Sequence, residues 1–427
     1  MKPGAAAVDS PAALLTILYL GLAAGVQMTD RGLLAMLSPA IQRSFGAGDA
    51  ALGALHGVAG ILAASALAIP LARLADRHSR KKLLRVFIAA WGGLTTLGAL
   101  ATWFPLFFVG HAAAGVTEFA LIPVIYSLLP DLVRPRRRVA ANLTFAALMA
   151  VGAGAGYALG GVLLGWAEAL RAAGLPLVGG MEAWRLAMLI MASFSLPLLL
   201  LGLAIVDPPR RHEAAVAAAT ELTLPGLLRL RGAAILPMVL AAGGIAVAVM
   251  GLMPLLTLAL TRRFAFDLGM LGEWLGVIVL ATNLASLGAA AMLDRLLPEA
   301  WRATGRPLAM AAGAAVALPC VLALPWARSV EDVLVLVSAF LLATCIANAF
   351  IPTMVQDLVP QALRARGFAF YSLIIASFSA LGPVLMGAVS DHLTGRDLLG
   401  AMTWVAVPSL ALAVACAALG ARRYGEA

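Results

Sequence analysis

The stretch Ala72-Arg73-Leu74-Ala75-Asp76-Arg77-His78-Ser79-Arg80-Lys81-Lys82 is a short, highly charged connection between two long apolar runs. Only 12% of the 427 residues are Asp, Glu, Lys or Arg, so composition alone does not explain this concentration of charge. Short loops rich in Arg and Lys stay on the cytoplasmic side when membrane-length helices flank them. The stretch therefore predicts a cytoplasmic loop of a membrane protein.

The composition of the whole chain agrees with this prediction. Hydrophobic residues make up 62% of the sequence, and the mean hydropathy is +0.97, far above that of soluble proteins. Apolar runs long enough to cross a hydrocarbon core of about 30 Å recur along the chain. We therefore predict an all-α polytopic membrane protein with twelve spans. These are residues 12–38, 51–71, 83–103, 106–128, 139–166, 184–206, 233–260, 271–292, 307–326, 331–354, 367–389 and 398–420.

The distribution of basic residues predicts the orientation in the membrane. With both termini inside, the inner segments contain most of the 30 Arg and Lys residues and the outer segments contain few. Such a bias is typical of cytoplasmic loops. Because it also accounts for the net charge of +9, we expect no nucleic-acid partner.

The sequence predicts neither an enzyme nor a cofactor site. No Ser/His/Asp, Walker-type or metal-ligand constellation is present in it, and the missing P-loop argues against an ATP-driven pump. Cys320, Cys345 and Cys416 all fall inside predicted spans without paired spacing or a histidine cluster. We therefore expect no disulfide framework and no metal site.

A weak internal repeat predicts two six-helix halves. The sequence Leu74-Ala75-Asp76-Arg77 has an echo in Met292-Leu293-Asp294-Arg295, and each follows the second span of its half. We predict an N-terminal bundle at 1–206, a cytoplasmic linker at 207–232 and a C-terminal bundle at 233–427. In carriers built from two such parallel repeats, the substrate site lies between the halves.

Glycines recur on one face of the fifth predicted span. Gly152, Gly156 and Gly160 are four residues apart, a spacing that lets helix backbones approach closely in lipid. Close helix packing is one interpretation of this pattern, and a moving hinge is the other.

Three charged residues within predicted spans stand out, namely Asp30 and Arg31 in the first span and Glu118 in the fourth. A charge at mid-membrane costs at least about 2.5–3.5 kcal/mol, so such residues have a function by default. Adjacent helical residues diverge by about 100°, so we expect Arg31 to pair with Glu118 on another helix, leaving Asp30 beside a cavity. A carboxyl group there could exchange protons with alternating sides of the membrane. The alternative is a static ion pair, with Asp30 completing a local hydrogen-bond network.

Further polar residues in the spans are candidates for substrate binding. His111 lies seven residues before Glu118 on the same helix face, although it could also be a packing histidine. Asn283, Asn348 and Tyr371 occur in otherwise apolar spans, and we expect them to face the central cavity. The alternative for these residues is that they hold neighbouring helices together.

The charged stretch resembles the cytoplasmic loop signature of the major facilitator superfamily, Gly-x-Leu-Ala-Asp-Arg-x-Gly-Arg-Lys. Four charged positions match, namely Asp76, Arg77, Arg80 and Lys81, while Ala72 and Ser79 stand in place of the two glycines. The resemblance implies a twelve-helix carrier in which these charged residues, with Asp294 and Arg295, form a cytoplasmic gate.

Other segments resemble one branch of that superfamily, the Spinster family. They are Thr29-Asp30-Arg31, Gly115-Val116-Thr117-Glu118 and Gly387-Ala388-Val389-Ser390-Asp391. Spinster relatives move sphingosine-1-phosphate and lysophospholipids, and the resemblance implies that Asp30, Arg31 and Glu118 act in coupling and gating. The chain departs from the family at His111, where an Arg is usual, and at Thr117, where a Gly is usual. The missing Arg removes an expected contact to an anionic head group.

These observations predict a monomeric, proton-coupled secondary transporter of the bacterial inner membrane. Its expected partners are protons, the lipid bilayer and a small amphipathic or anionic substrate, which could be lysolipid-like. An uncoupled lysolipid or drug exporter, or a facilitator, is the alternative within transport. A membrane receptor without transport activity is the alternative of another class.

Overall fold

The computed structural model describes residues 9–63, 65, 67, 78–174, 179–208, 224–264, 266–296, 302–358 and 364–424. Every regular element within these residues is a helix. In the first part of the chain they are α1 (Pro11–Phe45), α2 (Asp49–Ala54), π-helix η1 (Leu55–Leu62), α4 (Arg80–Ala99), α5 (Phe104–Leu132), 3-10 helix η2 (Pro135–Arg137), α6 (Arg138–Ala172), α7 (Ala183–Ser193) and α8 (Ser195–Leu201). In the remainder they are α9 (Leu224–Arg263), α10 (Leu268–Leu296), α11 (Arg302–Ala323), 3-10 helix η4 (Leu324–Trp326), α12 (Val330–Ala349), α13 (Ile351–Leu358), α14 (Arg364–His392) and α15 (Leu398–Tyr424).

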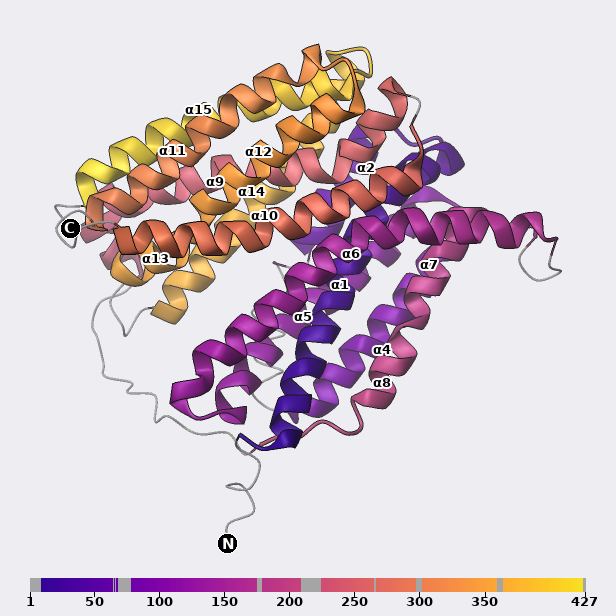
Figure 1. Ribbon diagram of the computed structural model, residues 1–427, viewed down its shortest axis with the longest axis horizontal. Coiled ribbons are helices and arrows are strands. Elements are labelled where there is room, and N and C mark those ends of the chain that lie inside the picture. Colours follow the sequence, from indigo (N-terminus) through magenta and orange to yellow (C-terminus); the bar gives the residue numbers. More distant parts are fainter. Residues whose placement is uncertain are drawn as a thin grey trace, which may run out of the picture. The chain divides into compact units, whose positions relative to one another are not determined.

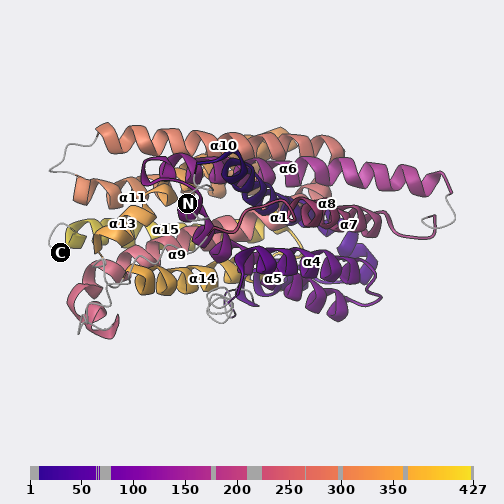
Figure 2. The same cartoon turned by 90° about the horizontal axis from the view of Figure 1, so that it is seen from below.

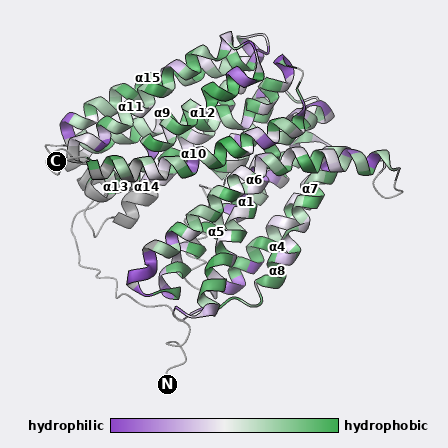
Figure 3. Cartoon of the chain, viewed as in Figure 1, coloured by the Kyte–Doolittle hydropathy of each residue, from purple (hydrophilic) through white to green (hydrophobic). Residues whose placement is uncertain are grey.

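Ten of the helical segments are long and apolar enough to cross a membrane, counting only the described residues. Apolar residues dominate the middle of the helices, and hydrophilic residues gather toward their ends (Figure 3). Two predicted spans lie outside this set of ten. The span 51–71 is described only in part, and the span 83–103 corresponds to α4, which begins with the basic residues Arg80, Lys81 and Lys82.

Two predicted spans are interrupted in the structure. The span predicted at 184–206 contains α7 and α8 and ends as a helix at Leu201, and the span predicted at 331–354 contains α12 and the first part of α13. The breaks precede Pro197 and Pro352, respectively. A proline has no N–H for the carbonyl four residues earlier, and its ring crowds that carbonyl, so both interruptions have a local cause.

The chain forms two compact units. Unit 1 contains Met1–Ala47, Val58–His212 and Phe266–Leu280, and unit 2 contains Gly48–Gly57, Glu213–Ala265 and Ala281–Ala427. Each unit therefore includes one short segment from the other half of the sequence. The division into two six-helix halves with a linker at 207–232 remains a prediction.

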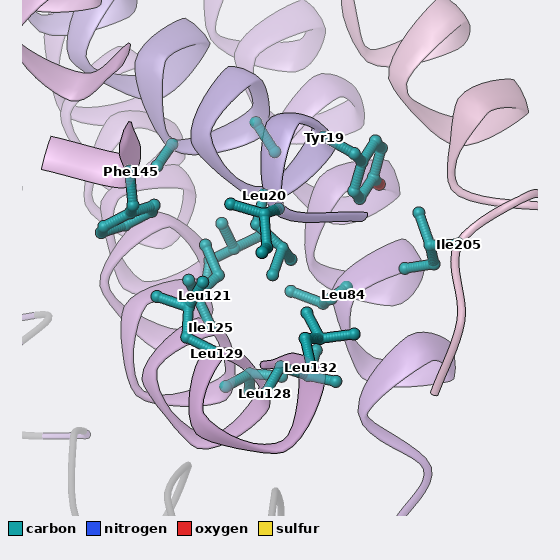
Figure 4. Close-up of a cluster of buried hydrophobic side chains, with 14 of the residues drawn as sticks. Tyr19, Leu20, Leu84, Leu121, Ile125, Leu128, Leu129, Leu132, Phe145 and Ile205 are labelled. Carbon is teal, nitrogen blue, oxygen red and sulfur yellow. The ribbon is translucent and has the colours of Figure 1, made fainter. Parts of the chain in front are cut away.

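Unit 1 is organised around the contact between α1 and α6, which run side by side in Figure 1. A Cβ added to Gly152 would lie 2.1 Å from the carbonyl oxygen of Gly25, and one added to Gly156 would lie 2.6 Å from that of Thr29. Glycine is thus required for this backbone approach. Next to this contact, α1, α4, α5 and α6 enclose a cluster of buried apolar side chains, and Figure 4 shows Phe145 and Ile205 at its edges.

Unit 2 is organised around α9, which packs against α14 and α15, while α11 packs against α12 and α15 (Figures 1 and 2). The short helix α2 packs against α14. A Cβ on Gly53 would lie 2.1 Å from the carbonyl oxygen of Pro383, and one on Gly387 would lie 2.2 Å from that of Asp49. Glycines on both helices therefore permit this contact.

Candidate functional site

A guanidinium and a carboxyl group meet in the middle of unit 1. Arg31 on α1 bonds through Nε to Oε2 of Glu118 on α5, at 3.2 Å. The Glu118 side chain is 4% exposed, whereas the Arg31 side chain is 38% exposed. The carboxyl group of the pair is thus buried, whereas its guanidinium is partly accessible.

Asp30 belongs to the same cluster. It is buried, and its Oδ2 accepts a hydrogen bond from the indole N–H of Trp91 on α4 at 3.2 Å. Its carboxyl group also forms a side-chain hydrogen bond with Glu118. We expected Asp30 to lie beside a cavity, but its side chain is buried. Burial is tolerated because an indole N–H and a second carboxyl group bind its oxygens.

The contact between the two carboxyl groups requires a proton. Ionised carboxylates have no hydrogen to donate, so a hydrogen bond between Asp30 and Glu118 forms when one of them is protonated. With one such proton, the cluster of Arg31, Asp30 and Glu118 is electrically neutral. Without it, a second negative charge is buried next to the first, and like charges in a buried site disfavour each other.

One aromatic ring covers the guanidinium of the cluster, and a stacked pair lies further along the helix that carries Glu118. The guanidinium of Arg31 lies 4.5 Å from the ring centroid of Phe119, a cation–π geometry. His111 is half-buried and stacks on Phe107, with ring centroids 6.4 Å apart and ring planes 19° apart. Arg31 therefore combines a partly accessible positive charge with an apolar wall, which suits an amphipathic anion.

The other predicted substrate-binding residues belong to unit 2. Asn283 on α10, Asn348 on α12 and Tyr371 on α14 are all half-buried. The backbone carbonyl of Asn283 accepts a hydrogen bond from the Ser286 hydroxyl at 2.8 Å. Their place in a central cavity stays a prediction.

The predicted gate residues are described to different extents. Asp76 and Arg77 lie outside the described residues, and Asp294 and Arg295 lie on α10 with side chains that are likewise outside the description. The Lys81 ammonium donates to the carbonyl oxygens of Leu203 and Ile205, at 2.7 and 2.9 Å.

Arg80 at the start of α4 is the centre of a buried polar network. Its Nη1 lies 2.6 Å from Oδ2 of Asp131, and its Nε lies 3.1 Å from Oδ1 of Asp207. Nη1 also donates to the carbonyl oxygen of Ser127 at 2.8 Å. Arg80 thereby joins the start of α4, the end of α5 and the segment after α8.

Sequence reasoning missed several of these partners. Asp131 follows the fourth predicted span and Asp207 follows the sixth, at the end that the charged stretch shares. This placement could have predicted them as acidic partners of the charged stretch. Trp91 gave no such signal, because an indole in an apolar span is usually a packing residue. Its hydrogen bond to Asp30 depends on how α4 is rotated against α1.

A second missed cluster lies in unit 2. Asp49 is fully buried at the start of α2 and binds Arg262 of α9, with Nη1–Oδ2 at 2.7 Å. The Ser390 hydroxyl donates to Asp49 Oδ2 at 2.6 Å, and Asp391 accepts from the backbone N–H groups of Asp49 and Ala50. This cluster joins α2, α9 and α14. Among the described residues, no group of three or more His, Cys, Asp or Glu side chains is arranged to hold a metal ion.

Comparison with known proteins identifies the family to which the chain is similar. Residues 20–383 match the model of the Major Facilitator Superfamily. The chain is similar to an MFS-type efflux pump of Mycolicibacterium smegmatis (strain ATCC 700084 / mc(2)155), with 28% identity over 418 residues, covering 95% of this chain and 92% of the relative.

Solved structures share the fold. A bacterial homolog to the human lysosomal transporter Spinster, in an inward-facing and unoccupied conformation, superposes with a TM-score of 0.81 at 19% identity, covering 97% of this chain and 98% of that one. A D-xylose–proton symporter superposes with a TM-score of 0.68 at 14% identity, covering 94% and 96%. The predicted fold class is thereby confirmed.

Proposed function

The chain belongs to the Major Facilitator Superfamily and is a multi-pass membrane transporter, and from this premise we propose that it couples the movement of protons to that of a small amphipathic or anionic organic molecule. The observation that carries the proposal is the cluster of Arg31, Glu118 and Asp30. It brings one cation and two carboxyl groups together inside predicted spans, where unpaired charge is costly.

Competition for one guanidinium supplies the coupling. When Glu118 is ionised it holds Arg31, at the 3.2 Å distance observed. When Glu118 takes up a proton, its attraction for Arg31 falls, and the partly exposed guanidinium becomes available to an anionic group of the substrate. Loss of the proton re-forms the ion pair and displaces the substrate.

Asp30 provides a place for the proton within the cluster. Its hydrogen bond with Glu118 lets a proton pass between the two carboxyl groups without crossing apolar surroundings. The indole N–H of Trp91 holds the Asp30 carboxyl group in position. Proton movement can then be confined to one cluster, and the rest of the transporter supplies alternating access.

The environment of Arg31 supports an amphipathic substrate. Phe119 lies over the guanidinium, and Phe107 and His111 provide stacked rings on the helix that carries Glu118. The mycobacterial relative is named an efflux pump, which supports transport of a small molecule as the activity. We further propose that the protein resides in the bacterial inner membrane as a monomer with both termini in the cytoplasm, which the bias of basic residues supports.

The test is substrate transport into proteoliposomes under an imposed pH gradient. A thermal-shift screen against metabolites, lysolipids and amphipathic drugs first identifies a binding compound for use in that assay. Glu118→Gln mimics the protonated side chain, so we expect it to keep substrate binding and to abolish the pH dependence of transport. We expect Arg31→Ala to lose both binding and transport, because it removes the substrate contact and leaves Glu118 buried without its cation.

Glu168→Gln is the matched control, because Glu168 is exposed near the end of α6 in the same unit. We expect its pH profile to equal that of the parent. If Glu118→Gln keeps the parent pH profile, coupling through this pair is refuted. If the parent itself ignores the pH gradient, the protein is an uncoupled exporter.

A further inference from the structure

A second arginine inside unit 1 lacks an acidic partner. Arg85 lies on α4 and is half-buried, and its Nε is fully buried without a hydrogen-bond partner. Within the described part of the chain it forms no ion pair, in contrast to Arg80 one turn earlier, which binds Asp131 and Asp207. A buried guanidinium N–H without an acceptor is costly, so a negatively charged ligand that accepts from it suits this position.

An unpartnered hydroxyl group lies next to Arg85. Tyr19 on α1 is 5% exposed, and its hydroxyl is buried without a hydrogen-bond partner. Arg85 is within electrostatic range of this hydroxyl. Both groups converge on Gly202, because a methyl group added there would lie 2.8 Å from the Tyr19 oxygen and 3.3 Å from Cγ of Arg85.

An apolar pocket adjoins Tyr19, which lies next to Arg85. It has a volume of about 410 Å³ and includes Tyr19 in its wall. Its apolar lining includes Leu15, Leu18, Leu22, Leu148, Leu201 and Ile205. The first three are 67%, 40% and 45% exposed, so the pocket opens on the apolar outer surface of α1. Figure 4 shows Tyr19 and Ile205 on the same side of the buried cluster.

The depth of the site suits a lipid head group. Arg85 is five residues from the start of α4, or about 7.5 Å along the helix axis. Lys81, one turn nearer the helix start, holds the carbonyl oxygens of Leu203 and Ile205 and adds a second positive charge at the same edge. Tyr19 is eleven residues from Asp30 on α1, about 16 Å along the axis, so the site is separate from the proposed proton site.

We propose that this pocket binds a diacyl phospholipid from the membrane, with its phosphate between Arg85 and Tyr19 and an acyl chain along Leu15, Leu18 and Leu22. The phosphate accepts charge-assisted hydrogen bonds from the guanidinium and a hydrogen bond from the phenol. The acyl chain covers apolar surface of α1 and α6. Basic pockets between helices at the cytoplasmic side are a known mode of phospholipid binding.

The experiment counts lipids bound to the purified full-length protein by native mass spectrometry. The probes are phosphatidylglycerol, diacylglycerol with the same acyl chains, and inorganic phosphate as a competitor. We expect the parent to bind phosphatidylglycerol in preference to diacylglycerol. We expect Arg85→Gln to weaken phosphatidylglycerol binding at least about tenfold, since a hydrogen bond to a charged group contributes about that much.

Two further variants separate the site from general effects. Tyr19→Phe keeps the ring and removes the hydroxyl, so we expect binding about fivefold weaker and no loss of thermal stability in lipid-free detergent. If Arg85→Gln does not fold, Tyr19→Phe tests the proposal in its place. Lys82→Gln removes the same charge from an exposed position on the same helix, and we expect it to bind like the parent.

Four results would overturn the proposal. They are unchanged phosphatidylglycerol binding in Arg85→Gln or Tyr19→Phe, an equal loss in Lys82→Gln, equal binding of diacylglycerol by the parent, and displacement of the lipid by inorganic phosphate at comparable concentration. The last result would identify free phosphate as the ligand.

Discussion

Arg31 and Arg80 use their guanidinium groups in different ways. The Arg80 side chain is 3% exposed and is held by Asp131 and Asp207, so its charge is neutralised in place. The Arg31 side chain is 38% exposed, with Glu118 on its buried side. Arg80 therefore fixes the ends of three segments, whereas Arg31 can exchange one anionic partner for another.

The role of Arg80 leads to a stability prediction. Arg80→Gln leaves Asp131 buried without its cation, which costs about 3–5 kcal/mol. We expect a clearly lower midpoint of thermal unfolding in detergent. Arg80→Lys restores the charge but not the forked geometry, so we expect it to recover only part of the loss.

The exposed neighbour Lys82 supplies the comparison for this experiment. Lys82→Gln should unfold at the parent temperature, because an exposed lysine contributes little. Equal unfolding temperatures for Arg80→Gln and Lys82→Gln would contradict a stabilising role for the Arg80 network.

The sequence was informative about charged residues and less so about their surroundings. It paired Arg31 with Glu118, because an isolated charge in a span is costly and few carboxylates are available. It did not place Trp91 beside Asp30, since that contact depends on the rotation of one apolar helix against another. Asn283, Asn348 and Tyr371 remain predictions for the same reason.

At the scale of helices, the contact between α1 and α6 depends on glycines, which have no side chain. Gly152→Ala would bring a methyl group to 2.1 Å from the Gly25 carbonyl oxygen, a backbone atom that cannot move aside alone. We expect a loss of about 1–3 kcal/mol, typical of overpacking, measured as a lower unfolding temperature.

Gly165 on the same helix provides the control, because an added Cβ there meets no atom within 4 Å. Gly165→Ala should be neutral or stabilising by up to about 1 kcal/mol, since alanine favours helix more than glycine does. Equal effects of the two substitutions would mean that helix propensity, not packing against α1, determines the role of these glycines.

The start of α7 gives a pH-dependent prediction at the same scale. Burial disfavours the ionised form of Glu182, but hydrogen bonds from Arg185 and Ser44 together outweigh this and hold the pKa of Glu182 below its ordinary value. A lowered pKa in the folded state stabilises the protein above the unfolded-state pKa. That contribution disappears as the pH falls through the folded-state pKa.

We therefore expect Glu182→Gln to lower the unfolding temperature slightly near neutral pH and to leave it unchanged at a pH where Glu182 is protonated. Unfolding followed across that pH range provides the measurement. A difference between variant and parent that does not change with pH would assign the effect to lost packing.

At the scale of the whole molecule, the long apolar runs were sufficient to predict an all-helical, multi-pass membrane protein, whereas the two-bundle fold also needed the internal repeat and the family resemblance. Long apolar runs must be helices in lipid, because each backbone group needs a partner within the span. The breaks before Pro197 and Pro352 were visible as prolines but not as helix ends, since prolines are common within membrane helices. The segments at residues 48–57 and 266–280 join units built mainly from the other half, which no local pattern indicates.

The central claim is that the carboxyl groups of Asp30 and Glu118 bind the transported proton. Infrared difference spectroscopy of the purified protein, recorded during a pH titration, detects the carbonyl stretch of a protonated carboxylic acid without requiring a known substrate. We predict one such band that titrates in the parent and is missing in both Glu118→Gln and Asp30→Asn. A band that persists in both variants, or its absence from the parent at every pH at which the protein is folded, would contradict the claim.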